Sequence, residues 1–220
     1  MTGQKGHATA ERARWKQDPD AVRADILRIA TSEFARAGLD GARMDEIAAR
    51  TRTSKRMIYY YFGDKAGLYR AVLEQAYRDM RLGEEELNLD DLPADAALRR
   101  LLEYSFDHHM RNTDFIRLVM NENMHNGEYL ELSDEIRRLN ASAIERVESI
   151  YARGCAEGVF RAGLSPMHLH WFISGLSFFN SSNRATFALI FGDALFAPDG
   201  QEALRGEIVE MIMRYVAAPG

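Results

Sequence analysis

The feature that most constrains this chain is the segment at residues 44–68, which reads MDEIAARTRTSKRMIYYYFGDKAGL. It holds two short apolar patterns of helical period with a few polar residues between them, which predicts two short helices joined by a turn. Lys55, Arg56 and three consecutive tyrosines crowd the second pattern. Cations beside aromatic side chains on a short helix are suited to enter a DNA groove and to hold phosphates.

Helical spacing of apolar residues continues along most of the chain, and no segment alternates with a period of two between turn residues. Asp18-Pro19 predicts the start of the first helix and Gly38 its end, because these residue types satisfy or terminate a helix backbone. The later helices are expected at about 44–51, 55–61, 65–82, 93–111, 114–125, 132–157, 166–181 and 200–217. The predicted fold class is therefore all-α.

Charge divides the chain into two parts. Residues 1–78 contain fifteen Lys/Arg against ten Asp/Glu, whereas residues 79–220 contain thirteen against twenty-three. A basic N-terminal part on an acidic remainder predicts two surfaces with different partners, and the acidic part would be repelled from DNA. Residues 1–17 are polar, basic and without periodicity, and we expect a flexible arm there.

Several classes of protein are disfavoured by composition. Cys155 is the single cysteine, so no internal disulfide forms, and we expect an inert thiol in a reducing cytoplasm. The absence of a long apolar run predicts no membrane span and no secretory signal. The five histidines after residue 100 include no i, i+4 pair, so no metal site is predicted, and no cofactor is expected.

The order of residues in the N-terminal part of the chain, the head, resembles the TetR family of one-component bacterial regulators. The matching positions are residues 45–48, the run 54–62, Lys65 and Leu68, and the likeness extends over residues 20–75. The Ala-Gly-Val turn that is usual in the family is replaced here by residues 51–53, Thr-Arg-Thr. Glycine tolerates a positive φ and arginine does not, so either this turn is rebuilt or Arg52 is strained.

The resemblance implies a three-helix helix-turn-helix head whose second motif helix enters the major groove of an operator. Arg56 or Lys55 would donate to guanine, Met57 would meet a thymine methyl, and the remaining residues would contact the phosphate backbone. The predicted DNA-binding residues are Arg43, Ser54, Lys55, Arg56, Met57, Tyr59, Tyr60 and Lys65.

The resemblance also implies that the larger helical part is a ligand-binding and dimerisation domain. Its layout is weakly similar to the branch that includes the pyrimidine-utilisation regulator. Apolar and aromatic residues with a few polar ones predict a small-molecule pocket, and the candidates are Phe106, His109, Met110, Phe115, Met120, Asn121, Met124, His125, Trp171, Phe172, Phe178 and Phe179. The last two long helices would form the homodimer seam through Ile173, Ser177, Leu204, Ile208, Met211, Ile212 and Tyr215, with His170 beside them.

The predicted organisation is an arm (1–17), a helix-turn-helix domain (18–64), a connecting helix (65–82) and a ligand-binding and dimerisation domain (83–220). The predicted function is a ligand-responsive regulator, a repressor that binds a palindromic operator as a dimer and is released by a small molecule. Two alternatives remain open. One is a helical adaptor that docks a protein through the tyrosine-rich helix, and the other is an acid–base enzyme that uses Asp114, Glu122 or His125.

Overall fold

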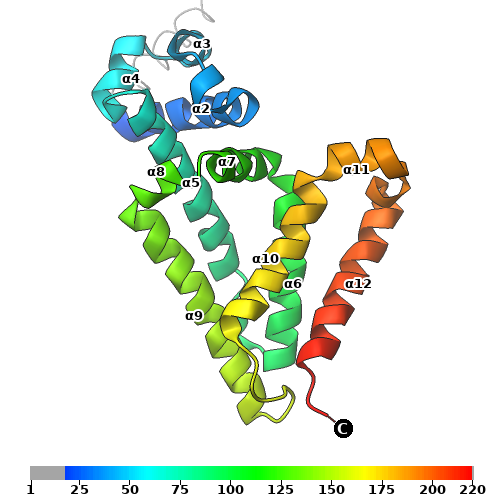
Figure 1. Ribbon diagram of the computed structural model, residues 1–220. Coiled ribbons are helices and arrows are strands. Elements are labelled where there is room, and N and C mark those ends of the chain that lie inside the picture. Colours follow the sequence, from blue (N-terminus) through cyan, green and yellow to red (C-terminus); the bar gives the residue numbers. More distant parts are fainter. Residues whose placement is uncertain (1–17, 220) are drawn as a thin grey trace, which may run out of the picture.

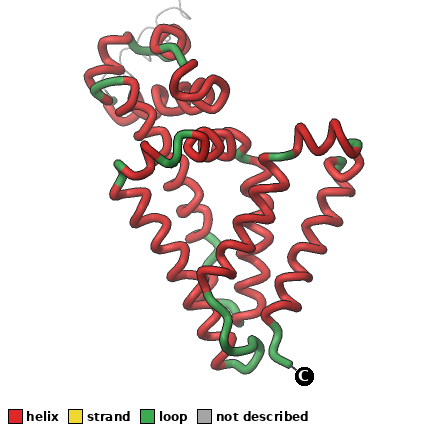
Figure 2. The backbone as a smooth tube through the Cα atoms, viewed as in Figure 1, coloured by secondary structure: helices red, strands yellow, loops and turns green. Residues whose placement is uncertain are grey.

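Helices follow one another along the computed structural model, which describes residues 18–219. Figure 2 shows them joined by loops, and the only β-type pairing among the described residues is an isolated antiparallel bridge between Phe160 and Ala217. The all-α prediction is confirmed. The arm expected at residues 1–17 lies outside the described residues. No described helix is both long enough and apolar enough to cross a bilayer.

The head consists of α2 (Pro19–Gly41), α3 (Met44–Arg50) and α4 (Lys55–Phe62). Asp18 caps α2, since its carboxylate accepts hydrogen bonds from the backbone N–H groups of Asp20 and Ala21, each at 3.1 Å. Gly38 has φ +68° and ψ 178°, which kinks α2 where the sequence predicts its end. The chain therefore turns at Gly38, and one more helical turn follows before α3.

Apolar side chains from four helices meet in the core of the head. Ile26, Phe34, Ile47, Ile58 and Leu68 are all completely buried. They come from α2, α3, α4 and the helix that follows, at the spacing that places one face of each helix inward. Burial of each such side chain contributes roughly 1.5–3 kcal/mol, and together they offset the cost of ordering these short helices.

Helix α5 (Lys65–Glu85) connects the head to the body, as Figure 1 shows. Asp64 caps it by accepting a hydrogen bond from the Gly67 N–H at 2.7 Å. A Cβ atom at Gly67 would lie 2.1 Å from the carbonyl oxygen of Phe62, so only glycine allows α5 to begin this close to α4. The helix ends three residues beyond the predicted 82, because Arg81 and Glu84 on its last turns pair inside the body.

The body contains α6 (Ala94–Arg111), α7 (Thr113–Met124), α8 (Glu128–Glu131), α9 (Asp134–Ala156), α10 (Pro166–Ser182), α11 (Arg184–Phe191), α12 (Pro198–Val216) and the 3-10 turns η1 (Leu89–Asp91) and η2 (Ala194–Phe196). The bounds of α6, α7, α9, α10 and α12 agree with the sequence prediction to within about two residues. The short helices α8 and α11 were not predicted; α8 has only four residues, too few to show a helical period.

Two packing units lie within the body. Helices α6, α9, α10 and α12 enclose a core that includes Leu98, Ile150, Leu169 and Ile173. Helix α7 lies across the end of these helices and separates them from the head in Figure 1, and it packs against α2. Because α5 and α7 each touch both parts of the molecule, a change inside the body can reach the head through either helix.

Candidate functional site

Helix α4 is anchored on one side and exposed on the other. Ile58 is fully buried, whereas Tyr60 is 77% exposed and Arg56 is also exposed. Ser54 caps the helix, its hydroxyl accepting a hydrogen bond from the Met57 N–H at 3.4 Å. The structure thus presents the predicted groove-entering helix to solvent, with Tyr59 exposed and Met57 half-buried at its edge.

The turn before α4 is rebuilt rather than strained. Among the described residues the non-glycine positions with positive φ are Asn88 and Asn126, so Arg52 keeps an ordinary backbone conformation. Its N–H donates to a carboxylate oxygen of Asp25 on α2 at 3.0 Å. Burial acts to raise the pKa of Asp25, but the hydrogen bonds from Arg52 and Arg28 outweigh it and lower the pKa below its usual value. Helix α2 therefore stabilises the turn through Asp25, and the turn does not need the glycine that is usual in the family.

Two of the cations predicted to bind DNA, Lys55 and Lys65, already have partners within the protein. Lys55 Nζ lies 2.7 Å from Asp45 Oδ1 on α3, and this hydrogen bond raises the pKa of Lys55. Lys65 Nζ donates to the Asp40 carbonyl oxygen at 3.2 Å. Arg43, just before α3, is exposed. Lys55 and Lys65 thus each use one of their three N–H donors within the protein.

A buried carboxylate that the sequence analysis missed ties α2 to α3. Glu33 is 2% exposed and lies 2.6 Å from Arg36 and 3.5 Å from Arg50. The i, i+3 spacing of Glu33 and Arg36 was a signal for the first contact. Nothing in the local sequence identified Arg50 as the second partner.

Helix α7 contacts the head through polar groups on one face. Asn121 donates to the Phe34 carbonyl oxygen at 3.2 Å, and Ser32 donates to Asp114 at 3.2 Å. His125 Nε2 lies 3.7 Å from a carboxylate oxygen of Asp40. Asn121 and His125, predicted for the pocket, are therefore placed at the boundary between head and body.

Glu122 belongs to the same helix and is almost fully buried. Its carboxylate accepts hydrogen bonds from the N–H groups of Tyr129 and Leu130, each at 3.1 Å, at the start of α8. The three side chains considered for acid–base chemistry, Asp114, Glu122 and His125, are thus each engaged in a contact between helices.

A cavity of about 380 Å³ opens between α5, α6, α7, α9 and α10. Its lining includes four of the predicted pocket residues, which are His109, Phe115, Trp171 and Phe178. The lining residues that the sequence analysis did not propose for a pocket are Tyr77, Met80, Arg81, Val119, Asn123, Asn140, His170, Ser174 and Gly175. His170, which the sequence placed beside the dimer seam, faces this cavity instead.

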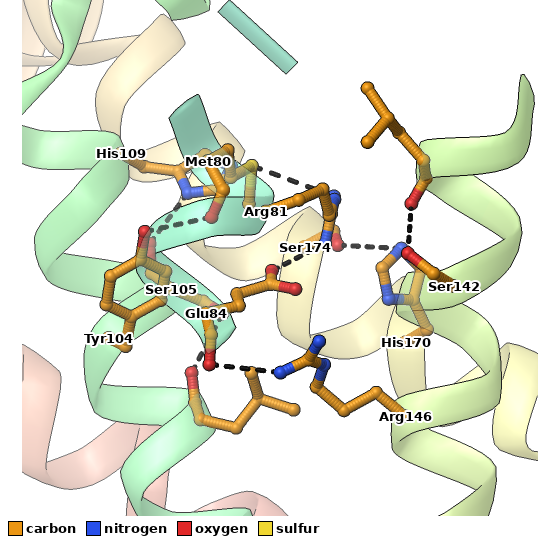
Figure 3. A network of polar contacts seen from close by, with 12 residues as sticks. Met80, Arg81, Glu84, Tyr104, Ser105, His109, Ser142, Arg146, His170 and Ser174 are labelled. Atoms are coloured by element: carbon orange, nitrogen blue, oxygen red, sulfur yellow. Dashed lines mark hydrogen bonds and ion pairs between the residues drawn. The ribbon is translucent and has the colours of Figure 1, made fainter. Parts of the chain in front are cut away.

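Figure 3 shows a network of polar contacts that includes five residues of the cavity lining, Met80, Arg81, His109, His170 and Ser174. Arg81 Nη1 donates to Glu84 Oε1 at 2.5 Å, and both residues are at least 95% buried. His109 Nδ1 donates to the Ser105 carbonyl oxygen at 2.6 Å. Desolvation by burial lowers the pKa of His170 to about 4, with a smaller contribution from Arg81, and lowers that of His109 as well. Both histidines are therefore neutral near pH 7.

The other predicted pocket residues do not line this cavity. Phe106 belongs to the body core, and Met110 packs against it. Met120 and Met124 are exposed on α7. Phe172 and Phe179 line a groove on the opposite side of α10. The pocket candidates are divided among several neighbours because one helix presents different faces to each of them.

That groove lies between α10 and α12, has a volume of about 660 Å³, and is bordered by exposed apolar side chains. Trp171 is 68% exposed, Phe179 56% and Met211 52%, and Tyr215 is also exposed. Four of the seven residues predicted for the dimer seam, Ile173, Ser177, Ile208 and Ile212, are buried within the protomer, and Ile212 also lines the groove. Leu204 is half-buried, and Met211 and Tyr215 remain accessible.

The cavity and the groove share one wall. Trp171, Gly175 and Phe178 border both spaces, since they lie on the part of α10 that separates them. Among the described residues, no group of three or more His, Cys, Asp or Glu side chains is arranged to hold a metal ion.

Comparison with known sequences agrees with this geometry. The profile described as "Bacterial regulatory proteins, tetR family" matches residues 26–72, and that of the "Tetracyclin repressor-like, C-terminal domain" matches residues 94–212. The chain belongs to the TetR family. The first match covers the head with the start of α5, and the second covers most of the body.

Relatives of this TetR-family chain include the HTH-type transcriptional repressor NicS of Pseudomonas putida. The two are 34% identical over 170 residues, which is 77% of this chain and 80% of NicS. The crystal structure of SCO4942 from Streptomyces coelicolor is similar with a TM-score of 0.68 and 26% identity, covering 90% of this chain and 99% of that one. FadR of Bacillus subtilis, in complex with stearoyl-CoA, shares the fold with a TM-score of 0.68 at 16% identity, over 86% and 97% of the two chains.

Proposed function

We propose that this TetR-family chain is a cytoplasmic transcriptional repressor that binds a palindromic operator as a homodimer and leaves it when a small molecule fills the body cavity. The observation that carries the proposal is the outward face of α4, with Arg56 and Tyr60 exposed and Ile58 anchored beneath them. Helix α4 is capped and anchored by Ile58, so it is held in place before DNA binds. The entropy lost by ordering this helix on DNA is therefore small.

The predicted contacts divide into two kinds. Arg56 and Met57 would meet base edges, and Lys55 would join them through the N–H donors that it does not use within the protein. Arg43, Tyr59, Tyr60 and Lys65 would contact phosphates, which set the register of the head without reading sequence. Ser54 acts by capping α4, because its hydroxyl is engaged with the Met57 N–H.

The groove between α10 and α12 is the surface that we assign to the second copy. Its border of Trp171, Phe179, Met211 and Tyr215 is more apolar than a monomeric protein normally exposes. A two-fold axis through this face brings the same side chains of both copies together. In such a dimer the two α4 helices would have to lie about 34 Å apart to enter successive major grooves.

Two helices can transmit the ligand signal. Tyr77, Met80 and Arg81 on α5 line the cavity, and the same helix begins in the core of the head. Phe115, Val119 and Asn123 on α7 line it too, while Asn121 and His125 on the same helix hold α2. A shift of either helix alters the position of the head, and a coupling of roughly 1–3 kcal/mol is enough for release.

A band-shift experiment with the DNA upstream of the chain's own gene tests the proposal. We expect salt-sensitive, sequence-selective binding by the wild type, and a loss of roughly tenfold or more in the Lys55→Ala/Arg56→Ala variant, which lacks two cations of the reading helix. The matched control is Arg99→Ala/Arg100→Ala, which removes two adjacent exposed arginines from α6. If both double variants bind DNA equally well, α4 is not the reading helix, and an adaptor role gains support.

A further inference from the structure

Arg81 lines the cavity and pairs with Glu84, which is not part of the lining, and its guanidinium group is only partly hydrogen-bonded. Glu84 accepts a hydrogen bond from Nη1 of Arg81, whereas Nη2 contacts a thioether, Met80 Sδ, at 3.7 Å. Nε of Arg81 is buried without a hydrogen-bond partner among the described residues. Nε and Nη2 lie on the same edge of a guanidinium group. From this edge two N–H groups can donate to the two oxygens of one carboxylate. A weak sulfur acceptor thus faces the edge that is best suited to an anion.

Charged groups of both signs lie around Arg81. Arg146 lies beside the pair, with its Nη1 donating to the Glu84 carbonyl oxygen at 3.0 Å. The side chains drawn in Figure 3 therefore include two guanidinium groups and one carboxylate. The nearby histidines add no charge near pH 7, because burial keeps His108, His109 and His170 neutral. Glu122, whose charge acts on Tyr77, and Glu86, whose charge acts on Tyr104, also lie near. It is therefore the open edge of Arg81, and not a surplus of positive charge, that favours an anion.

Aromatic side chains form part of the remaining lining, beside the polar groups of Asn140, His170 and Ser174. Phe115 and Tyr77 meet edge to face, with ring centroids 5.3 Å apart, and Trp171 and Phe178 approach from α10. Gly175 has no side chain to occupy the space between them. A volume of about 380 Å³ lies at the small end of ligand sites and suits a molecule of one or two rings. A long acyl chain with a nucleotide, as in the ligand of FadR, would not fit.

We propose that the effector of this chain is a small aromatic carboxylate whose carboxylate binds the Nε/Nη2 edge of Arg81 and whose ring lies among Phe115, Trp171 and Phe178. The inference rests on the proposed function, since it names the effector class of that site. Met80 moves aside when the acid enters, because an unbranched thioether changes rotamer easily. The neutral polar groups of Asn140, His170 and Ser174 select among ring substituents.

Calorimetric titration of the full-length protein with benzoate and 2-naphthoate tests the class, and benzamide and cyclohexanecarboxylate serve as matched controls. We expect the two aromatic acids to bind and to raise the unfolding temperature. Benzamide keeps the ring without the charge, and cyclohexanecarboxylate keeps the charge without the flat ring, so both bind at least roughly tenfold more weakly. Equal binding of acid and amide overturns the assignment of the anion. Absence of aromatic-acid binding up to about 10 mM overturns the class.

Two variants locate the site. Arg81→Leu/Glu84→Leu removes both charges together and keeps the volume apolar, which cores tolerate far better than a single unpaired charge. We expect it to fold and to lose benzoate binding by roughly tenfold or more. Glu84→Gln keeps Arg81 and removes its competing carboxylate, so benzoate binds as well or more tightly. Equal affinity in the double variant and the wild type, or loss of binding in Glu84→Gln, contradicts the role of Arg81.

A band shift on the same preparation separates this inference from the proposed function. DNA binding without aromatic-acid binding overturns the effector class and leaves the repressor intact. Aromatic-acid binding without DNA binding supports the site and overturns the repressor. When both bind, release of DNA by benzoate in the wild type, and its loss in the double variant, supports both.

Discussion

The head and the body place their charged groups in opposite ways. In the head, Arg43 and Arg56 face solvent, and even the buried Glu33 has partners, Arg36 and Arg50, that reach the surface. In the body, Arg81 and Glu84 are both at least 95% buried and pair beside an internal cavity. The difference teaches that the two parts meet different partners. Exposed cations suit a long polyanion outside the fold, whereas a buried charge beside a cavity suits a small guest.

The largest expected effect comes from breaking the interior pair on one side only. Arg81→Met leaves the Glu84 carboxylate buried and unpaired, which lowers the free energy of unfolding by about 4 kcal/mol. Urea denaturation at neutral pH measures the change. Arg99→Met, on the exposed face of α6, is the control and leaves stability unchanged. If Arg81→Met is as stable as the wild type, the guanidinium is not the counter-charge that the structure indicates.

Removal of the anchor of α4 is the next largest effect. Ile58→Ala leaves a cavity in the core of the head and lowers the free energy of unfolding by about 3 kcal/mol. DNA affinity falls as well, since the exposed residues of α4 are no longer held in place. Leu189→Ala on α11 is the matched control, because that side chain is 86% exposed. Circular dichroism during urea titration distinguishes the two, and equal losses would show that Ile58 is not an anchor.

Acid affects the body before it affects the head. Burial lowers the pKa values of His108 and His170 to about 4. Between that pH and the unfolded pKa, these residues are protonated in the unfolded chain but not in the folded chain. Their contribution to the free energy of unfolding is fully present above the unfolded pKa of about 6.5. It is lost as pH falls from there towards 4. His125 acts in the opposite sense, because a hydrogen bond to the Asn121 carbonyl oxygen and Asp40 raise its pKa. Its contribution is present below about 6.5 and is lost as pH rises above that value.

The unfolding temperature of the wild type is therefore expected to fall between pH 6.5 and 4, and His170→Gln, which does not titrate, makes that fall shallower. A calorimetric series across this range measures it. Asp25 and Asp45 do not account for the change, since their lowered pKa values confine their loss to pH below about 3.8. An identical pH profile in the variant and the wild type would contradict the burial of His170.

The smallest effect on stability is expected at the exposed pair of the head. Asp45→Ala breaks the contact with Lys55, but both side chains are solvated, so unfolding changes little. The freed Lys55 strengthens DNA binding by a few-fold at low salt, and the gain shrinks as salt rises. Fluorescence anisotropy with the operator measures it. In a Lys55→Ala background the same substitution should have much less effect, and an equal gain there would show that Asp45 acts only through its own charge.

The sequence predicted the head well because its signals are local. The Asp18 cap, the break at Gly38, the Asp64 cap and the burial of Ile58 all depend on residues a few positions apart. The turn at Arg52 was recognised as a departure from the family pattern. Its solution was not predictable, because the supporting Asp25 lies 27 residues earlier in the sequence.

The body was predicted as helices but not as a site. Its cavity combines residues between Tyr77 and Phe178 from five helices, and no short pattern shows which faces converge. Arg81 was passed over because a charged residue on a helix is normally solvated. Ile173 and Ile212 were assigned to the dimer seam, and both belong to the core of the protomer, because the same apolar stripe suits a protomer core and a partner equally well.

The wall formed by Trp171, Gly175 and Phe178 has a consequence for a dimer joined through the groove between α10 and α12. The same side chains would form one wall of the ligand cavity and part of the interface with the second subunit. A ligand that displaced this wall would also change the interface. The affinity of the second cavity would then depend on whether the first is occupied. Saturation of the pair would then follow a sigmoidal curve, and the response to the effector would be steeper than either subunit gives alone.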